Sequence, residues 1–280
     1  MEPTAKTDIR KLSPDEYHKQ TDYLSASMIK RFIESRRLFH DEYVLGSPRK
    51  RTASLDLGTV AHAMILEPHK IDEIAVEIPP EVLSKSGSKA GANWKKFEAE
   101  NEGAILLKSS EMKTVNAIFA NAYKNKAAHK LLKAKGETEE SIFMEDHWGK
   151  IRCRVDRRIP GKFIIDLKTT RDAAPDKFER QVRELGYHIQ AALYKRICDK
   201  HFGCDHTFLF IAVKSTHPYN VGIYSLSDRH LFEAENTLDR TIESITECKE
   251  TGDWREPWEK NLIELHPPKW WEPNDEGESE

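Results

Sequence analysis

The sequence predicts an α/β fold, and three observations support this prediction. Apolar residues recur at helical spacing through most of the first half of the chain. From Glu139 onwards the spacing changes to a period of two, which is typical of strands. A further helical stretch, about 175–201, separates these strands from two more at 207–214 and 219–225. A chain with this order of elements belongs to the α/β class.

The first half of the chain is expected to be mainly helical. Either Ser25 or Ser27 can cap the first helix, and Pro68 marks the end of the second. Residues 84–92 are rich in Ser, Gly and Lys and are expected to form a mobile loop. The expected helices cover about 23–39, 55–66, 93–101 and 110–133.

The second half is expected to contain the strands. Turn signals at 148–149 and 160–161 separate three of them, which cover 141–144, 151–158 and 162–169. Gly186 is expected to break the helix that follows, and Ser227 can cap a long last helix that ends near Lys249. The tail 254–271 carries four tryptophans and is expected to pack irregularly on the body.

Length and composition indicate one globular domain. At 280 residues, with 38% hydrophobic and 32% charged residues, the chain can bury a sizeable core. We expect a single domain over 23–271 with its core motifs within 140–225, an N-terminal extension over 1–22 and a disordered acidic tail over 272–280.

The same composition predicts a soluble cytoplasmic protein without a membrane partner. No apolar run approaches the roughly 18 residues that span a bilayer, and residues 1–11 lack a secretory signal. The four cysteines are scattered and form no C-x-x-C pair, as expected of reduced thiols.

The charge of the chain excludes one kind of nucleic-acid binding. A formal net charge of −3 does not allow the protein to coat nucleic acid through bulk positive charge, so any contact must be local. Basic residues cluster at 36–37, 49–51 and 152–162. Each cluster is either a solvated face or a phosphate site.

Two aspartates and a lysine form the most informative pattern. A hairpin centred on Gly161 sets Asp156 directly opposite Asp166 on one face of the sheet. The period of two puts Lys168 on the face of Asp166, and the backbone carbonyl of Leu167 lies near the same edge. The alternative is a surface strand with alternating charges, because a lone D-x-K tripeptide is common by chance.

Phosphodiester hydrolysis needs groups of this kind. Two carboxylates can hold one or two Mg²⁺ ions, which stabilise the attacking and leaving oxygens. Lys168 can orient the attacking water or offset charge that develops on the phosphate. Asp166 follows the apolar residues 163–165, and an unpaired carboxylate at the end of a buried strand is costly without a cation. This position favours a metal site.

Further candidates lie on the flanking helices. Gln190 and Tyr194 are four residues apart on one helical face with Tyr187, and they can reach a phosphate. His62 is either a metal ligand or a core histidine. The first helix offers phosphate contacts through its N-terminus and four side chains, Ser25, Ser27, Lys30 and Arg31.

Four motifs together resemble a known family. They are Gly58 to His62, Arg154-Val155-Asp156, Ile165 to Thr170 and Tyr187 to Tyr194, and the likeness continues through 208–213. The set is similar to the nuclease domain of RecE-type exonucleases, in the PD-(D/E)xK superfamily with RecB-like nucleases and lambda exonuclease.

The resemblance implies a restriction-endonuclease-like core with a central mixed β-sheet flanked by helices and a helical N-terminal elaboration. It implies that His62, Asp156, Asp166 and the Leu167 carbonyl bind two Mg²⁺ ions, for which Mn²⁺ can substitute. Lys168 would serve the water, while Gln190 and Tyr194 would steady the site. Arg154 and Tyr187 are expected to contact DNA.

The same resemblance implies how the protein acts. RecE-type enzymes degrade linear double-stranded DNA from its 5′ ends and leave a 3′ strand for a RecT-like single-strand annealing protein. They close into homo-oligomeric rings around DNA, which would give an acidic protein a basic inner surface. Such enzymes are bacterial, and a phage or prophage origin is expected.

Two other functions remain open. One is another nuclease of this fold: a RecB-like enzyme, a Cas4-like or AddB-like enzyme with an iron–sulfur cluster, or a sequence-specific restriction endonuclease. The absence of clustered cysteines argues against the cluster. The other is a DNA-binding or scaffold module that has lost catalysis.

Overall fold

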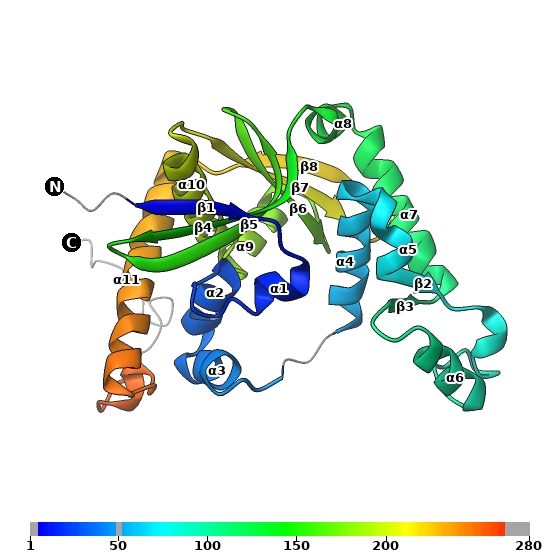
Figure 1. Ribbon diagram of the computed structural model, residues 1–280, viewed down its shortest axis with the longest axis horizontal. Helices are drawn as coiled ribbons and strands as arrows, with labels where there is room; N and C mark the ends of the chain where they lie inside the picture. Colours follow the sequence, from blue (N-terminus) through cyan, green and yellow to red (C-terminus); the bar gives the residue numbers. More distant parts are fainter. Residues whose placement is uncertain (1–4, 49–51, 267–280) are drawn as a thin grey trace, which may run out of the picture.

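A six-stranded mixed sheet forms the centre of the protein (Figure 1). The structure is a computed structural model that describes residues 5–48 and 52–266. The strands are β1 (Lys6–Arg10), β2 (Ala75–Glu77), β3 (Ile105–Leu107), β4 (Glu137–Asp146), β5 (Gly149–Ile159), β6 (Phe163–Thr170), β7 (Thr207–Lys214) and β8 (Val221–Ser225).

Helices surround this sheet. The α-helices are α1 (Pro14–His18), α2 (Ala26–Glu34), α3 (Arg36–Phe39), α4 (Ala53–Leu66), α5 (Ile71–Ile74), α6 (Ala92–Glu100), α7 (Ser109–Lys124), α8 (Lys126–Lys133), α9 (Pro175–Glu184), α10 (Tyr187–Phe202) and α11 (Asp228–Thr251). Short turns of other types are η1 (His40–Val44), η2 (Pro68–Lys70), η3 (Pro80–Val82) and η4 (Pro257–Glu259).

The strand order in the main sheet is β1-β4-β5-β6-β7-β8. Strands β6 and β7 are parallel, and the other neighbours are antiparallel. Parallel neighbours need a long crossover, and α9 with α10 provides it. The expected α/β class and central mixed sheet are therefore confirmed.

Two hydrophobic layers cover the two faces of the sheet. One contains residues of α2, α9, α10 and α11 and the inward side chains of β5 and β7, such as Val155 and Phe210. The other contains residues of α4, α7 and α8 with Ile165 and Ile211. Figure 1 shows these two groups of helices on opposite sides of the sheet.

Two expected helices are each divided by a capping residue. Ser35 has extended backbone angles (φ −165°, ψ 131°), so the helix expected over 23–39 becomes α2 and α3. Asn125 accepts from the backbone N–H groups of Ala127 and Ala128 and separates α7 from α8 within 110–133. Ser and Asn side chains offer the backbone an alternative partner to the helix ladder. The expected break at Gly186 is confirmed, at φ 63°.

The N-terminal segment is part of the domain rather than an appendage. Strand β1 pairs with the edge of β4, and the Tyr17 ring of α1 packs against Phe143. The boundary expected at Tyr23 therefore does not separate residues 5–22 from the sheet. A two-stranded sheet of β2 and β3 was not expected, because three-residue strands leave no periodic signal.

The C-terminal tail packs on the body where it is described. Trp254 stacks on Phe39 with ring centroids 5.7 Å apart. The basic cluster 49–51, the last part of the tryptophan-rich segment and the acidic tail 272–280 lie outside the described residues. Among the described residues, no helix is long and apolar enough to cross a membrane.

Candidate active site

The β5–β6 hairpin opens at the two aspartates. Its pairs, Arg157–Ile165, Arg158–Ile164 and Ile159–Phe163, have the expected register, which places Asp156 opposite Asp166. The ladder stops one residue before these aspartates. Instead, the backbone N–H of Leu167 donates to Oδ2 of Asp156 at 2.7 Å. The two strands therefore separate where the carboxylates project.

The Leu167 carbonyl is available at this opening. In an antiparallel ladder, the N–H and C=O of one residue point to the same neighbouring strand. Because the Leu167 N–H points to Asp156, its carbonyl points toward β5 as well. Strand β5 pairs with β6 only as far as Ile165, so the β5 ladder does not use this oxygen.

Asp166 is a buried carboxylate, and one of its two oxygens accepts no hydrogen bond. The residue is 1% exposed, and its Oδ1 accepts from Gln190 Nε2 at 2.6 Å. Its Oδ2 lies 2.6 Å from Lys168 Nζ but without hydrogen-bond geometry, and has no hydrogen-bond partner. Burial raises the pKa of Asp166, although Lys168 opposes this shift. Oδ2 is therefore ion-paired with Lys168 but accepts no hydrogen bond, which leaves it able to take a metal ion as well.

Two lysines gather around Gln190. Its Oε1 accepts from Lys168 Nζ at 3.2 Å and from Lys30 Nζ at 3.5 Å. Both ammonium groups also face the Tyr187 ring, at 4.5 and 5.2 Å from its centroid. Burial and the nearby Lys168 lower the pKa of Lys30 to about 8. The carboxylates of Asp166 and Asp156 outweigh burial and raise the pKa of Lys168.

His62 reaches the site from α4, which covers the face of the sheet opposite to α10. A Cβ at Gly58 would lie 3.2 Å from Thr169 Oγ1, so glycine allows α4 to approach β6 closely. Nε2 of His62 lies 2.7 Å from Asp156 Oδ2. Burial opposes protonation, but Asp156 and Glu139 raise the pKa of His62 to about 9. Burial likewise opposes ionisation of Asp156, but His62 lowers its pKa.

Glu139 is a site residue that the sequence analysis missed. The pairs Thr138–Arg157 and Glu140–Val155 leave Glu139 and Asp156 opposite each other in β4 and β5. Oε1 of Glu139 lies 3.3 Å from His62 Nδ1. The hairpin turns at 147–148, one residue before the expected turn at 148–149, which would have set Ser141 opposite Asp156, so the expected turn did not lead to this pair.

The strands are distorted where these carboxylates meet. Glu139 has φ 54° within a strand, a region that side-chain-bearing residues seldom adopt. Val155 and Ile159 are four residues apart and should share a face, but they lie in different hydrophobic layers. The alternation of side chains between the two faces of β5 is therefore interrupted near Asp156. Irregularities of this kind change the direction of side chains next to active sites.

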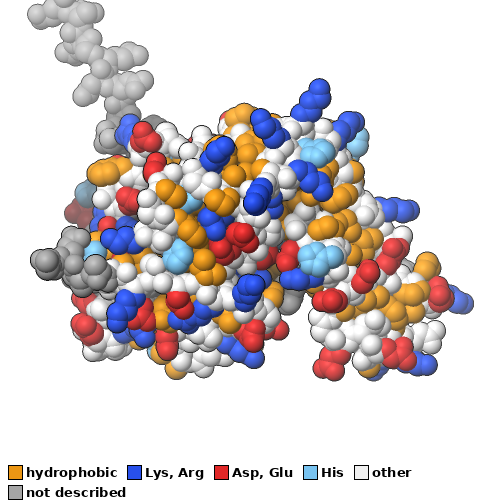
Figure 2. All heavy atoms as spheres, turned by 45° about the horizontal axis from the view of Figure 1, so that its top comes forward, with side chains coloured by type: hydrophobic (Ala, Val, Ile, Leu, Met, Phe, Trp, Pro, Cys, Tyr) orange, Lys and Arg blue, Asp and Glu red, His pale blue; other side chains and the backbone are white. Residues whose placement is uncertain are grey.

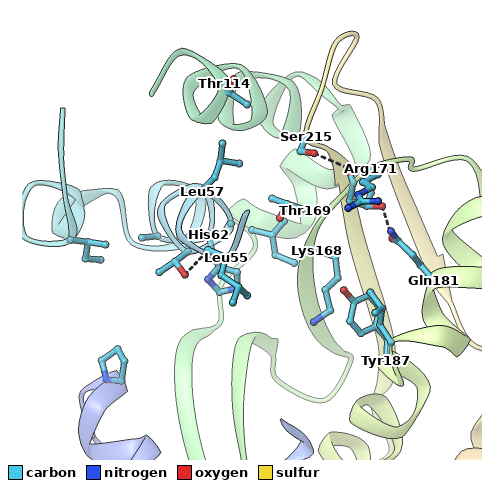
Figure 3. Close-up of a pocket in the computed structure, with 18 of the residues that line it drawn as sticks. Leu55, Leu57, His62, Thr114, Lys168, Thr169, Arg171, Gln181, Tyr187 and Ser215 are labelled. Carbon is cyan, nitrogen blue, oxygen red and sulfur yellow. Dashed lines mark hydrogen bonds between the residues drawn. The ribbon is translucent and has the colours of Figure 1, made fainter. Parts of the chain in front are cut away.

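A cleft of about 1160 Å³ borders the site, and Glu139 and Leu167 belong to its lining. His62, Arg154, Lys168 and Tyr187 are among its lining residues. Figure 3 shows His62 and Lys168 pointing into the space between α4 and the sheet, with Tyr187 beside Lys168. Acidic and basic side chains are interspersed over the face drawn in Figure 2.

Most of the predicted basic contacts have structural partners. Arg31 pairs with Glu34 at 2.7 Å and with Glu42 at 3.0 Å. Arg154 donates from Nε to Glu139 Oε2 at 2.5 Å, so it holds a carboxylate. The other arginines of the cluster 152–162 bind backbone carbonyls or Glu140, and they form neither a solvated face nor a phosphate site.

The remaining candidates lie around the site at different depths. Ser25 caps α2 by accepting from the Met28 N–H and lies 3.0 Å from the Ser27 hydroxyl. Tyr194 is 8% exposed and packs against Phe208. Burial raises its pKa well above the ordinary value, and both aspartates contribute. No hydrogen bond joins it to a carboxylate within the described part of the chain.

The donor set suits a hard divalent cation. His62, Glu139 and Asp156 each offer a ligand atom, and these atoms lie within 4.8 Å of one another. Asp166 Oδ2 and the Leu167 carbonyl add oxygens on the other side of Asp156. Oxygen ligands with one imidazole fit Mg²⁺ or Mn²⁺ better than a soft metal.

Comparison with solved structures finds proteins of similar fold. A crystal structure from Eubacterium rectale, provisionally described as an exonuclease, shares 18% identity and a TM-score of 0.63, over 93% of this chain and 97% of that one. A phage-related exonuclease from Haemophilus somnus 129PT shares 13% identity over 82% of this chain and 96% of that one. The TM-score of this second pair is 0.34.

The sequence itself matches a family model. None of the curated proteins matches the chain. Residues 25–261 match the family described as PDDEXK-like domain of unknown function (DUF3799). This match, with the likeness of fold, confirms the PD-(D/E)xK assignment made from the motifs. The chain belongs to this family of PDDEXK-like domains.

Proposed function

We propose that the protein is a divalent-metal-dependent exodeoxyribonuclease that digests linear double-stranded DNA. One observation carries the proposal. Asp156, Asp166, the Leu167 carbonyl and Lys168 converge at the open end of the β5–β6 hairpin, where a buried carboxylate oxygen has no hydrogen-bond partner. The PD-(D/E)xK family and the fold shared with a described exonuclease support it.

The residues divide the chemical work between them. A bound Mg²⁺ or Mn²⁺ ion would polarise the phosphate and lower the pKa of a water. Asp156, Asp166, the Leu167 carbonyl and His62 would hold one or two such ions. Lys168 would orient the water or offset negative charge on the phosphate. Gln190 fixes both Asp166 and Lys168, which it contacts with opposite ends of its amide.

DNA contact in this proposal is local. The cleft is lined by the glutamates Glu67, Glu111, Glu139 and Glu184 and by the cations Arg154, Lys168 and Arg171. Since Arg154 holds Glu139, we assign the phosphate contacts to Lys168, Arg171 and the neighbouring Lys30. Divalent ions on the carboxylates would strengthen the attraction of this lining for a phosphate backbone.

The direction and setting of the reaction rest on the resemblance to RecE-type enzymes. We propose digestion from 5′ ends, which leaves 3′ single strands for a RecT-like annealing protein in homologous recombination. A homo-oligomeric ring around the duplex would join several clefts of mixed charge into one DNA path. The proposed setting is the cytoplasm of a bacterial cell.

One experiment tests the activity and its direction together. Linear duplex DNA labelled at the 5′ or the 3′ end is digested beside a closed circle, with Mg²⁺, Mn²⁺ or EDTA. The proposal expects metal-dependent release of mononucleotides from 5′ ends and an intact circle. Cutting of the circle would indicate an endonuclease, and DNA binding without cutting would indicate an inactive binding module.

A further inference from the structure

We propose that Glu139 is a positioning residue that fixes the orientation and tautomer of His62 at the metal site. When a metal ion is bound, the Glu139 carboxylate would accept the Nδ1 proton of His62 and leave the Nε2 lone pair for the ion beside Asp156. The inference rests on the proposed metal site and adds a residue that acts through His62.

The geometry assigns different roles to the two ring nitrogens. Nδ1 forms an ion pair with Glu139 Oε1 at 3.3 Å that lacks hydrogen-bond geometry, whereas Nε2 is hydrogen-bonded to Asp156 Oδ2 at 2.7 Å. An imidazole can give only one nitrogen to one metal ion, and its other N–H is almost always donated to a carboxylate or carbonyl. Asp156 offers the metal-facing carboxylate, so Glu139 is left as the partner of the Nδ1 proton.

Both oxygens of Glu139 are committed to protein groups. Oε1 faces His62, and Oε2 accepts from Arg154 Nε at 2.5 Å. Arg154 is itself fixed, because its Nη1 donates to the Leu12 carbonyl at 3.0 Å. The chain of contacts therefore runs from the N-terminal segment through Arg154 and Glu139 to His62. A carboxylate held at both oxygens supports another side chain better than it binds an ion.

The backbone of Glu139 adopts an unfavourable conformation to place its side chain beside His62. A non-glycine residue at φ 54° costs about 1 kcal/mol or more and persists where the surroundings demand it. A second observation concerns the ligand: Asp166 Oδ2, in a residue 1% exposed, is ion-paired with Lys168 at 2.6 Å but accepts no hydrogen bond, so it can still take a metal ion. Glu139 and Asp166 lie on either side of Asp156 in the sheet.

The substitution Glu139→Gln tests whether Glu139 sets the tautomer of His62. In Glu139→Gln, the Arg154 N–H must still bond to an oxygen, so the amide oxygen turns to Arg154. The amide NH₂ group then faces His62 Nδ1 and donates to it. This bond places the imidazole proton on Nε2, where it blocks the metal. The variant keeps the size of the side chain and reverses the tautomer.

Glu140→Gln provides a matched control. Glu140 is the next residue in β4, and it is also paired with an arginine, Arg158, at 2.7 Å. Its side chain is 11% exposed, against 16% for Glu139. The control therefore loses the same charge from a similar environment, away from His62.

Two measurements test the inference. Mn²⁺ binding to the full-length wild type and both variants is followed by calorimetry, with circular dichroism as the check of folding. We expect Glu139→Gln to weaken Mn²⁺ binding about 10- to 100-fold and Glu140→Gln to leave it within about twofold. The ¹⁵N shifts of His62 with Mg²⁺ present, assigned with His62→Ala, should show the proton on Nδ1 in the wild type and on Nε2 in Glu139→Gln.

Each contrary outcome has a definite meaning. Equal Mn²⁺ affinity in Glu139→Gln and wild type would overturn the inference and leave the proposed nuclease site intact. Weakened binding with the proton still on Nδ1 would make Glu139 a direct ligand and also overturn it. If Glu139→Gln does not fold, a proton on Nε2 of His62 in the Mg²⁺-loaded wild type refutes the inference. A wild type that binds no Mn²⁺ would instead remove the metal site itself.

Discussion

The Leu167 backbone N–H donates a 2.7 Å hydrogen bond to Oδ2 of Asp156, across the gap where the β5–β6 ladder ends. The Leu167 N–H, which would otherwise donate to the β5 backbone, holds the Asp156 carboxylate instead. It also fixes the direction of the Leu167 carbonyl, because both groups of an extended residue point to the same side. One hydrogen bond thus orients two of the proposed metal ligands.

Asp166→Asn is expected to abolish metal binding while the metal-free protein still folds with lower stability. The substitution removes the carboxylate charge and its 2.6 Å ion pair with Lys168, but the amide oxygen can still accept from Gln190. Activity on linear DNA should fall about 100-fold or more, since even outer-shell partners of a metal contribute about 10- to 100-fold. Calorimetry with Mn²⁺ and thermal unfolding in EDTA check both parts.

Asp176→Asn on the exposed start of α9 makes the same chemical change away from the site. It should bind Mn²⁺ and digest DNA as the wild type does. Loss of stability in Asp166→Asn with unchanged Mn²⁺ affinity would mean that Asp166 has a structural role, and the proposed site would be wrong.

Lys168→Ala is expected to separate catalysis from metal binding. Its ammonium lies 2.6 Å from Asp166 Oδ2, so removing it leaves more negative charge for a cation. Hydrolysis should be lost, while Mn²⁺ affinity stays equal or rises. End-labelled DNA digestion and calorimetry measure the two effects. Lys162→Ala, in the exposed turn of the same hairpin, is the control, and unaltered turnover in Lys168→Ala would refute the assigned role.

The hairpin and its register could be predicted from the sequence because strand periodicity and turn residues are local signals. Strand β7 lies over Thr207–Lys214 as expected, and the turn at Gly161 set the pairing of Asp156 and Asp166. The helix break at Gly186 could also be predicted from the residue type, because its φ of 63° is one that glycine adopts readily.

Other parts depend on contacts that a linear pattern does not contain. The role of Glu139 follows from a left-handed backbone and from α4 crossing the sheet at Gly58, which lies 81 positions earlier in the chain. Arg31 has the residue type of a phosphate contact, yet Glu34 and Glu42 hold its guanidinium. Residue type predicts what a side chain can bind, while packing decides what it reaches.

Arg171→Ala is expected to weaken duplex binding and lower its salt dependence. Arg171 is exposed at the cleft, and no ion pair engages it within the described part of the chain. Losing one phosphate contact should reduce the slope of log affinity against log salt by about 1. Binding of labelled duplex in EDTA at several salt concentrations measures this slope. Arg31→Ala should leave it unchanged, and the reverse result would assign the phosphate contact to Arg31 instead of Arg171.

Lys30 is expected to make duplex binding sensitive to pH between 7 and 9. Burial and Lys168 lower its pKa to about 8, so its ammonium is mostly charged at pH 7 and mostly neutral at pH 9. Attraction to a phosphate is therefore lost as the pH rises through 8. The affinity of the wild type for duplex in EDTA should fall up to about fivefold, which is the worth of one screened charge contact of about 1 kcal/mol.

Lys30→Arg is the matched variant for this prediction, because a guanidinium stays charged over the whole range. Its duplex affinity should lose the step near pH 8 and keep only the gradual change shared by all variants. The Lys30 side chain packs against Gly186: a Cβ added at Gly186 would lie 3.0 Å from Lys30 Cδ. The longer arginine side chain must therefore extend beyond this contact. A step of the same size in Lys30→Arg would assign the pH dependence to another group and remove Lys30 from the DNA path.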